Sequence, residues 1–181
     1  MIQIRIHGRG GQGVVTAAEI IAIAAFSDGK EAQAFPSFGV ERTGAPVESY
    51  ARINDTFIRN REQVYNPDVL IIQDETLLNN PAILNGITPK TKIIINTPKK
   101  KEEIKISIKP VNIFVIDASK IAMETIGKNI MNTVVLGAFA KATKLVSLDS
   151  LKSAIHDKLI AKGEDIVNKN IKAIEKAYEI A

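Results

Sequence analysis

The hydrophobic pattern of the chain first predicts β-strands. Residues 2–7 alternate isoleucine with a polar residue, which is the two-residue period of a strand. Residues 68–74, 92–96 and 113–117 are nearly continuous apolar runs with polar residues at their ends. Central strands of a parallel sheet are covered on both faces and have this composition. These four segments therefore predict a mainly parallel sheet.

Two further segments predict an antiparallel part of the sheet. Residues 47–53 alternate between apolar and polar side chains, as a half-buried strand does. Asn54 and Asp55 are typical of a turn, so we expect residues 56–58 to return as a hairpin partner. Residues 30–34 are expected to form a short strand. The predicted sheet is therefore mixed.

Helical patterns occur near the start of the chain and in its last third. We expect one helix over residues 14–26, ended by Gly29 as a C-cap. Residues 130–142 are small or apolar nearly all round, which predicts a helix packed on every side. Residues 147–160 and 164–180 each carry one apolar stripe and predict amphipathic helices.

These elements predict the α/β class: a single three-layer, Rossmann-like domain over residues 1–181, with a mixed, mainly parallel sheet and C-terminal helices. The length suits one well-buried domain and is short for two. We find no linker, internal repeat or low-complexity tract in the sequence.

A glycine-rich turn joins the first strand to the first helix. Gly8, Gly10 and Gly13 have the Gly-x-Gly-x-x-Gly spacing in the strand–turn–helix setting that phosphate binding requires. A second interpretation is a tight turn that needs small residues only for packing. Asp28 and Glu31 lie near the position of a ribose-binding acid, but neither follows a clear second parallel strand, so the dinucleotide fingerprint is incomplete.

Residues 35–46 form the second unusual stretch. They hold two prolines, two glycines, two phenylalanines and the pair Glu41-Arg42, without periodicity. A loop of this length is usually functional or disordered, and its aromatic residues argue against disorder. Two interpretations stay open: a surface loop anchored by its phenylalanines, or a binding loop in which Arg42 meets an anion or a partner carboxylate.

Composition excludes several chemistries. Without cysteine the chain has no disulfide, thiol nucleophile or cysteine-held metal cluster. His7 and His156 are far apart, and we expect no metal site and no catalytic residue. A net charge of +4 without a clustered basic patch argues against nucleic-acid binding. We expect no membrane span and a cytoplasmic location. Asp74 and Asp117, which close two predicted strands, are either ligand contacts or, more commonly, helix N-caps.

Two long motifs together resemble the gamma subunit of 2-oxoacid:ferredoxin oxidoreductases, in the pyruvate:ferredoxin oxidoreductase (pyruvate synthase) branch. The motifs cover residues 4–17 and 33–47, and the resemblance continues through 65–68, 74–78 and 129–146. The gamma subunit of a branched-chain 2-oxoacid:ferredoxin oxidoreductase is the alternative within this family. From the glycine spacing alone, an independent nucleotide- or flavin-binding protein is the other alternative.

The resemblance implies a subunit that is inactive alone and supports oxidative decarboxylation of pyruvate to acetyl-CoA, or the reverse. It implies alpha, beta and delta-type partner subunits that hold thiamine diphosphate, Mg²⁺ and [4Fe-4S] clusters and pass electrons to ferredoxin. It also implies coenzyme A as the ligand of this chain. The residues expected to bind it are Gly8, Arg9, Gly10, Gly11, Gln12 and Gly13 of the turn and Ser37, Phe38, Gly39, Glu41, Arg42 and Gly44 of the loop.

Overall fold

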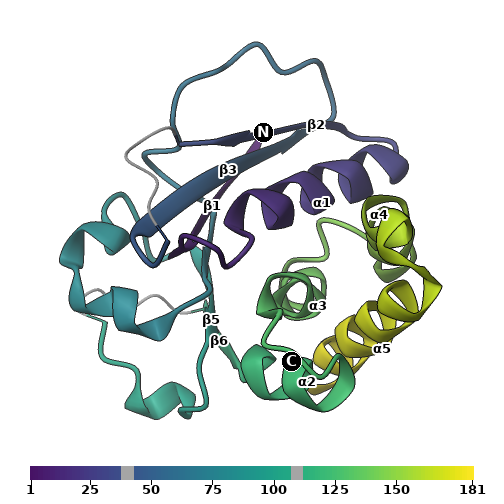
Figure 1. Cartoon of the computed structure of the whole chain (residues 1–181). Helices are drawn as coiled ribbons and strands as arrows, with labels where there is room; N and C mark the ends of the chain where they lie inside the picture. Colours follow the sequence, from purple (N-terminus) through teal and green to yellow (C-terminus); the bar gives the residue numbers. More distant parts are fainter. Residues whose placement is uncertain (38–42, 107–111) are drawn as a thin grey trace.

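The computed structural model describes residues 1–37, 43–106 and 112–181, built around a six-stranded sheet in the order β2-β3-β1-β4-β5-β6 (Figure 1). Strand β1 (Ile2–Arg9) pairs in parallel with β4 (Val69–Ile72), and the parallel pairing continues to β5 (Lys92–Asn96) and β6 (Asn112–Ile116). On its other side β1 pairs antiparallel with β3 (Pro46–Asn54), which pairs antiparallel with β2 (Glu31–Pro36). Within the described chain β3 alone runs against the other strands, so the predicted mixed, mainly parallel sheet is confirmed.

The hairpin predicted over residues 54–58 is wrong. Strand β3 pairs with β2 along one edge and with β1 along the other, so neither edge is open to residues 56–58. Asn54 instead donates from its side chain to the carbonyl oxygen and hydroxyl of Thr56, which turns the chain away from the sheet. The antiparallel part of the sheet therefore exists, but its second strand precedes β3 in the sequence.

All five described α-helices lie on one face of the sheet (Figure 1). They are α1 (Val14–Ser27), α2 (Ala118–Thr125), α3 (Met131–Thr143), α4 (Leu148–Leu159) and α5 (Glu164–Ile180). Short 3₁₀ helices replace α-helices elsewhere: η1 (Glu75–Asn79), η2 (Pro81–Leu84), η3 (Lys101–Glu103) and, between α4 and α5, η4 (Ile160–Lys162). Apolar side chains of η1 and η2 cover the other face of β4 and β5. The sheet is thus the middle of three layers.

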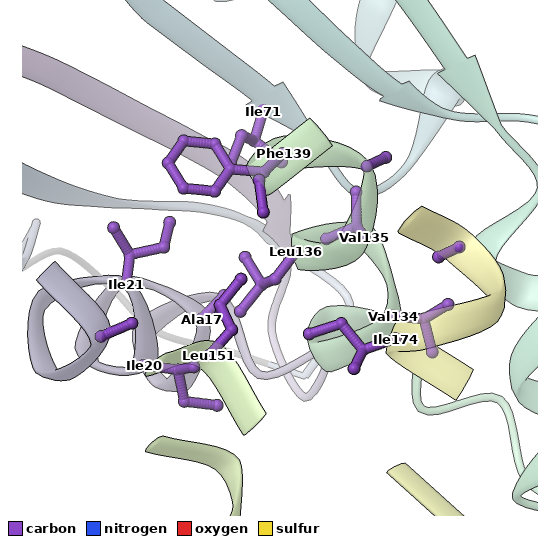
Figure 2. Packing of buried hydrophobic residues seen from close by; sticks show 14 of the residues in the cluster. Ala17, Ile20, Ile21, Ile71, Val134, Val135, Leu136, Phe139, Leu151 and Ile174 are labelled. Atoms are coloured by element: carbon purple, nitrogen blue, oxygen red, sulfur yellow. The ribbon is translucent and has the colours of Figure 1, made fainter. Parts of the chain in front are cut away.

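Helix α3 is the centre of the main core. Every residue from Met131 to Ala140 is buried, as its composition predicts. A Cβ at Gly137 would lie 2.3 Å from the carbonyl oxygen of Ile174, so this glycine lets α5 pack directly against α3. Figure 2 shows side chains of α1, α3, α4, α5 and the sheet meeting in one apolar cluster, among them Ile21, Ile71, Leu136, Phe139, Leu151 and Ile174.

The end of α1 and the start of α4 are joined by one carboxylate. Asp28 accepts hydrogen bonds from the Ser147 N–H (2.6 Å), the Ser147 hydroxyl (2.8 Å) and the Ser150 hydroxyl (2.6 Å). Ser147 in turn caps α4. The C-cap of α1 is Asp28 rather than Gly29, and Gly29 follows it with a φ of 76°. Asp28 therefore has a structural role here, whereas the incomplete dinucleotide fingerprint would have placed it near a ribose.

Candidate anion-binding site at the glycine turn

The glycine turn, residues 8–13, connects the end of β1 to the first turn of α1. Gly13 is the N-cap residue of α1, with a φ of 70°. Among the described residues, no side chain caps this helix and its first turn holds no acidic residue. The first N–H groups of a helix have no partner within the helix and lie at the positive end of its dipole. Those of α1 are therefore left to meet an anion.

Two of the glycines are required by close packing. A Cβ at Gly8 would lie 2.5 Å from Cγ2 of Val14, and one at Gly13 would lie 2.4 Å from Nδ2 of Asn132. Asn132 of α3 also donates to the carbonyl oxygen of Gly13 (3.2 Å), so α3 packs against the turn and bonds to it. Gly11 has a φ of 93°, and a Cβ there would meet no atom within 4 Å. Packing thus explains two glycines, while Gly11 faces open space.

The structure joins the two stretches that the sequence singled out. The Gly10 N–H donates to the carbonyl oxygen of Ala45 (2.8 Å), and the Gly44 N–H donates to that of Gly10 (3.1 Å). The end of the predicted loop therefore pairs with the middle of the glycine turn. At the other end of the loop, Ser37 bonds through its N–H to the carbonyl oxygen of Glu48 (3.1 Å).

Arg9 is held by three contacts rather than solvated. It donates from Nε to Asp74 (2.9 Å), from one terminal nitrogen to the carbonyl oxygen of Gly44 (3.1 Å) and from the other to the hydroxyl of Thr76 (2.7 Å). Gln12 also donates to Asp74 (3.2 Å) and accepts from the Arg9 N–H (2.7 Å). Each terminal nitrogen of Arg9 keeps one N–H beyond these bonds. A direct phosphate contact by Arg9 therefore stays a prediction.

Asp74 has a second role that the sequence did not predict. It caps η1, as its N-cap interpretation predicts, and it also orders the turn through Arg9 and Gln12. Burial raises the pKa of Asp74, but the hydrogen bonds from Thr76 and Gln12 and the Arg9 charge outweigh it, so the pKa lies below its ordinary value. The carboxylate stays ionised at neutral pH. Asp117 is the N-cap of α2 and accepts from the Lys120 N–H.

A pocket of about 450 Å³ lies against the turn, and we call it the glycine-turn pocket. Turn, helix and loop contribute to its lining, which includes Gly10, Gly11, Gly13, Val15, Thr43 and Glu48. Of the residues expected to bind coenzyme A, the turn and Gly44 thus lie together and Ser37 lies beside Glu48. Phe38, Gly39, Glu41 and Arg42 lie outside the described residues, so their part in the site stays a prediction. Thr43 belongs to the loop that the sequence singled out, whereas no sequence pattern pointed to Glu48 of β3.

A buried polar network lies beneath this pocket. Tyr50 donates to Glu48 (2.6 Å), and Nδ1 of His7 lies 3.6 Å from the other oxygen of that carboxylate. Burial, followed by the charge of Arg5, lowers the pKa of His7 to about 3. Burial and the bond to Glu48 raise the pKa of Tyr50 to about 12. His7 and Tyr50 are therefore neutral at physiological pH.

Within residues 1–37, 43–106 and 112–181, no cluster of three or more histidine and acidic side chains could hold a metal ion. In the same ranges, no helix has both the length and the apolar character to cross a membrane.

Comparison with known proteins identifies close relatives over nearly the whole chain. A family model described as pyruvate ferredoxin/flavodoxin oxidoreductase matches residues 3–180. The chain is 49% identical to the common subunit gamma of pyruvate/ketoisovalerate oxidoreductases from Pyrococcus abyssi, over 99% of this chain and 96% of that protein.

The solved structures that share its fold include two oxidoreductases. Subunit PORC of the Thermotoga maritima pyruvate oxidoreductase superposes with a TM-score of 0.86 at 37% identity, over 98% of this chain and 95% of that one. A 2-oxoglutarate:ferredoxin oxidoreductase from Magnetococcus marinus, solved with 2-oxoglutarate, coenzyme A and succinyl-CoA bound, gives a TM-score of 0.79 at 25% identity. This match covers 99% of the present chain and 31% of the longer one.

Proposed function

Because the chain belongs to the pyruvate ferredoxin/flavodoxin oxidoreductase family, we propose that it is the gamma subunit of a pyruvate:ferredoxin oxidoreductase and binds coenzyme A at the glycine-turn pocket. The family that the two sequence motifs predicted is confirmed. The complex converts pyruvate, coenzyme A and two oxidised ferredoxins into acetyl-CoA, CO₂, a proton and two reduced ferredoxins, or runs in reverse. In this proposal alpha, beta and delta-type partner subunits in the cytoplasm hold thiamine diphosphate, Mg²⁺ and the [4Fe-4S] clusters.

The observation that carries the ligand proposal is the uncapped start of α1 beside a pocket. Coenzyme A brings a pyrophosphate and a ribose phosphate, and a helix N-terminus with free N–H groups is suited to bind such an anion. Arg9 and the Gln12–Asp74 contact keep the turn in the conformation that presents these groups. The relative from Magnetococcus marinus, solved with coenzyme A bound, supports the same ligand class. The task of this chain is then to bind and orient the acyl acceptor.

A branched-chain 2-oxoacid is the second candidate substrate. The relative from Pyrococcus abyssi is named as a gamma subunit common to pyruvate and ketoisovalerate oxidoreductases. A gamma subunit that binds only coenzyme A serves both enzymes, because both reactions use the same acyl acceptor. Choice of 2-oxoacid then belongs to the partner subunits.

The test places a negative charge where the phosphate is proposed to bind. Val15 lies in the first turn of α1, lines the pocket and is 36% exposed. Val15→Glu suits the helix, because an acid in the first turn is favourable to its dipole, but it repels an anion nearby. Repulsion between the new carboxylate and one phosphate charge about 5 Å away costs roughly 1–3 kcal/mol. This range covers effective dielectric constants from that of bulk water to that of the protein surface. We expect the KM for coenzyme A to rise about five- to a hundredfold, while the KM for pyruvate stays unchanged.

Val15→Gln is the matched control, because it has the same length without the charge. Both variants are assayed in the whole complex, purified through a tag on this chain so that the recovered subunits also identify the partners. Equal coenzyme A dependence in Val15→Glu, Val15→Gln and the wild type would show that the ligand binds elsewhere.

A further inference from the structure

The connection between β3 and β4 contains no helix or strand over residues 55–68. It lies on the side of β2 and β3 away from α1 (Figure 1). A connection of this length without secondary structure is uncommon in a compact domain and is usually either functional or disordered. We call residues 55–65 the β3–β4 segment.

The backbone of the β3–β4 segment is tied to the sheet. Gln33, Arg52 and Arg5 donate hydrogen bonds from the strands to its carbonyl oxygens. These acceptors belong to Ile58 (3.2 Å), Asn60 (3.4 Å), Glu62, Val64 (3.2 Å) and Tyr65 (3.2 Å). Arg52 is 0% exposed and Arg5 is 6% exposed. Burying a guanidinium is costly unless hydrogen bonds compensate, so the carbonyl oxygens hold the arginines and the arginines fix the segment.

The side chains of the segment divide into a buried and an exposed set. Ile58 and Val64 are buried against the rest of the chain, at 6% and 2% exposure. Phe57 and Tyr65, in contrast, are 74% and 65% exposed. A Cβ at Gly86 would lie 1.9 Å from the carbonyl oxygen of Tyr65, so the backbone at this ring is closely packed. The two rings are therefore presented to the outside by a fixed backbone.

Two arginines of the segment are left without a carboxylate. Arg59 and Arg61 are exposed, and the ion pairs of the described residues include neither of them. Asp55 pairs with the lysine that precedes β2. Burial lowers the pKa of Arg52, and the nearby charge of Glu62 partly offsets this effect. Both acids of the segment thus face other cations, which leaves Arg59 and Arg61 for the carboxylates of another molecule.

These features are those of a protein interface. Aromatic residues and arginine are enriched where proteins meet and supply many of the residues that dominate binding. A fixed backbone loses little conformational freedom on binding. Because the chain carries a net charge of +4, free arginines favour an acidic partner over a second copy of this chain.

We propose that the β3–β4 segment is a docking surface for a partner subunit of the oxidoreductase complex, whose identity rests on the proposed function. The partner places carboxylates against Arg59 and Arg61 and apolar surface against Phe57 and Tyr65. The segment then has a task separate from that of the glycine-turn pocket.

The test compares three variants in the whole complex, purified through a tag on this chain. Arg59→Glu/Arg61→Glu reverses both charges, and Phe57→Ser and Tyr65→Ser each remove one exposed ring. Dissociation of the complex on dilution is followed by mass photometry. We expect the dissociation constant to rise about ten- to a hundredfold in each variant. Added salt should weaken the wild-type complex more than the charge-reversed one.

Lys162→Glu/Lys172→Glu is the matched control, because it makes the same change of charge at exposed residues of η4 and α5. It should dissociate like the wild type. Each purified variant chain should keep the wild-type midpoint of unfolding. A lower midpoint in Arg59→Glu/Arg61→Glu would show that these arginines stabilise the chain itself, and it would overturn the inference.

The remaining outcomes separate this inference from the proposed function. Wild-type dissociation in all three variants overturns the docking surface and leaves the subunit assignment in place. If the wild-type chain recovers no oxidoreductase subunits, the proposed function fails and the inference fails with it. Self-association of the purified chain that Phe57→Ser abolishes would identify a second copy as the occupant and contradict a partner subunit.

Discussion

The free energy of unfolding should depend on pH through His7. The His7 side chain is 7% exposed, Nδ1 faces Glu48 at 3.6 Å, and Nε2 has no partner among the described residues. Burial, and then the charge of Arg5, lower its folded pKa to about 3 from an ordinary value of 6.5. The folded protein therefore holds His7 neutral at pH values where the unfolded chain already protonates it.

The sign and size follow from this difference. Above about pH 6.5 His7 is neutral in both the folded and the unfolded protein, so it does not change the free energy of unfolding. Between about pH 6.5 and 3 the unfolded chain binds a proton at His7 that the folded protein does not bind, and the free energy of unfolding falls. A shift of about 3.5 units corresponds to roughly 5 kcal/mol in total, of which about 2.5 kcal/mol falls between pH 6 and pH 4. The protein should therefore lose stability through His7 as the pH falls across this window.

The measurement is chemical denaturation of the wild type and His7→Gln from pH 7 to pH 4. The wild type should lose about 2.5 kcal/mol more than the variant between pH 6 and pH 4, because carboxylates titrate in both proteins and cancel in the difference. His156→Gln removes an exposed histidine of α4 and should follow the wild type. A difference between wild type and His7→Gln that does not change with pH would refute the buried, neutral histidine.

Two further predictions concern the helical layer. Gly137→Ala should lower the free energy of unfolding by about 1–3 kcal/mol in denaturation experiments, because its Cβ would lie 2.3 Å from the carbonyl oxygen of Ile174; an unchanged midpoint would mean that α3 and α5 are less tightly packed. Asp28→Ala should cost about 0.5–2 kcal/mol by removing the acceptor at the start of α4, with exposed Asp149→Ala as the control. Burial raises the pKa of Asp28, but the hydrogen bonds from Ser150 and Ser147 outweigh this effect, so its pKa lies below the ordinary value. The stabilisation by Asp28 should therefore persist down to about pH 4 and disappear below it. A loss of this stabilisation near pH 6 would contradict the assignment.

The strands and helices were largely predictable because each is specified by a local period. The alternation over residues 2–7 became β1, the apolar runs became β4, β5 and β6, and the stripe over residues 164–180 became α5 with the same bounds. The wrong hairpin at residues 56–58 shows the limit of this reasoning. A local turn signal says that the chain reverses, but it does not say which edges of β3 are already occupied.

Part of the candidate site was also contained in the sequence. The glycine spacing between a strand and a helix identified the turn, and the irregular composition of residues 35–46 identified its neighbour. Both features follow from backbone requirements, since a sharp turn and a close helix start need residues without side chains at particular points. The sequence motifs also identified the family.

The partners of the site residues were decided only by the tertiary structure. Arg9 and Asp74 are 65 positions apart, Gly13 and Asn132 are 119 apart, and Gly10 meets Ala45 through a pairing that no local pattern specifies. Nor does the sequence show that the Gln73 carboxamide is buried without a partner among the described residues. The local sequence fixes which residues turn, extend or coil, because these preferences depend on near neighbours. Which polar groups face each other, and which are left for a ligand, depends on strand order and helix packing, which only the folded chain establishes.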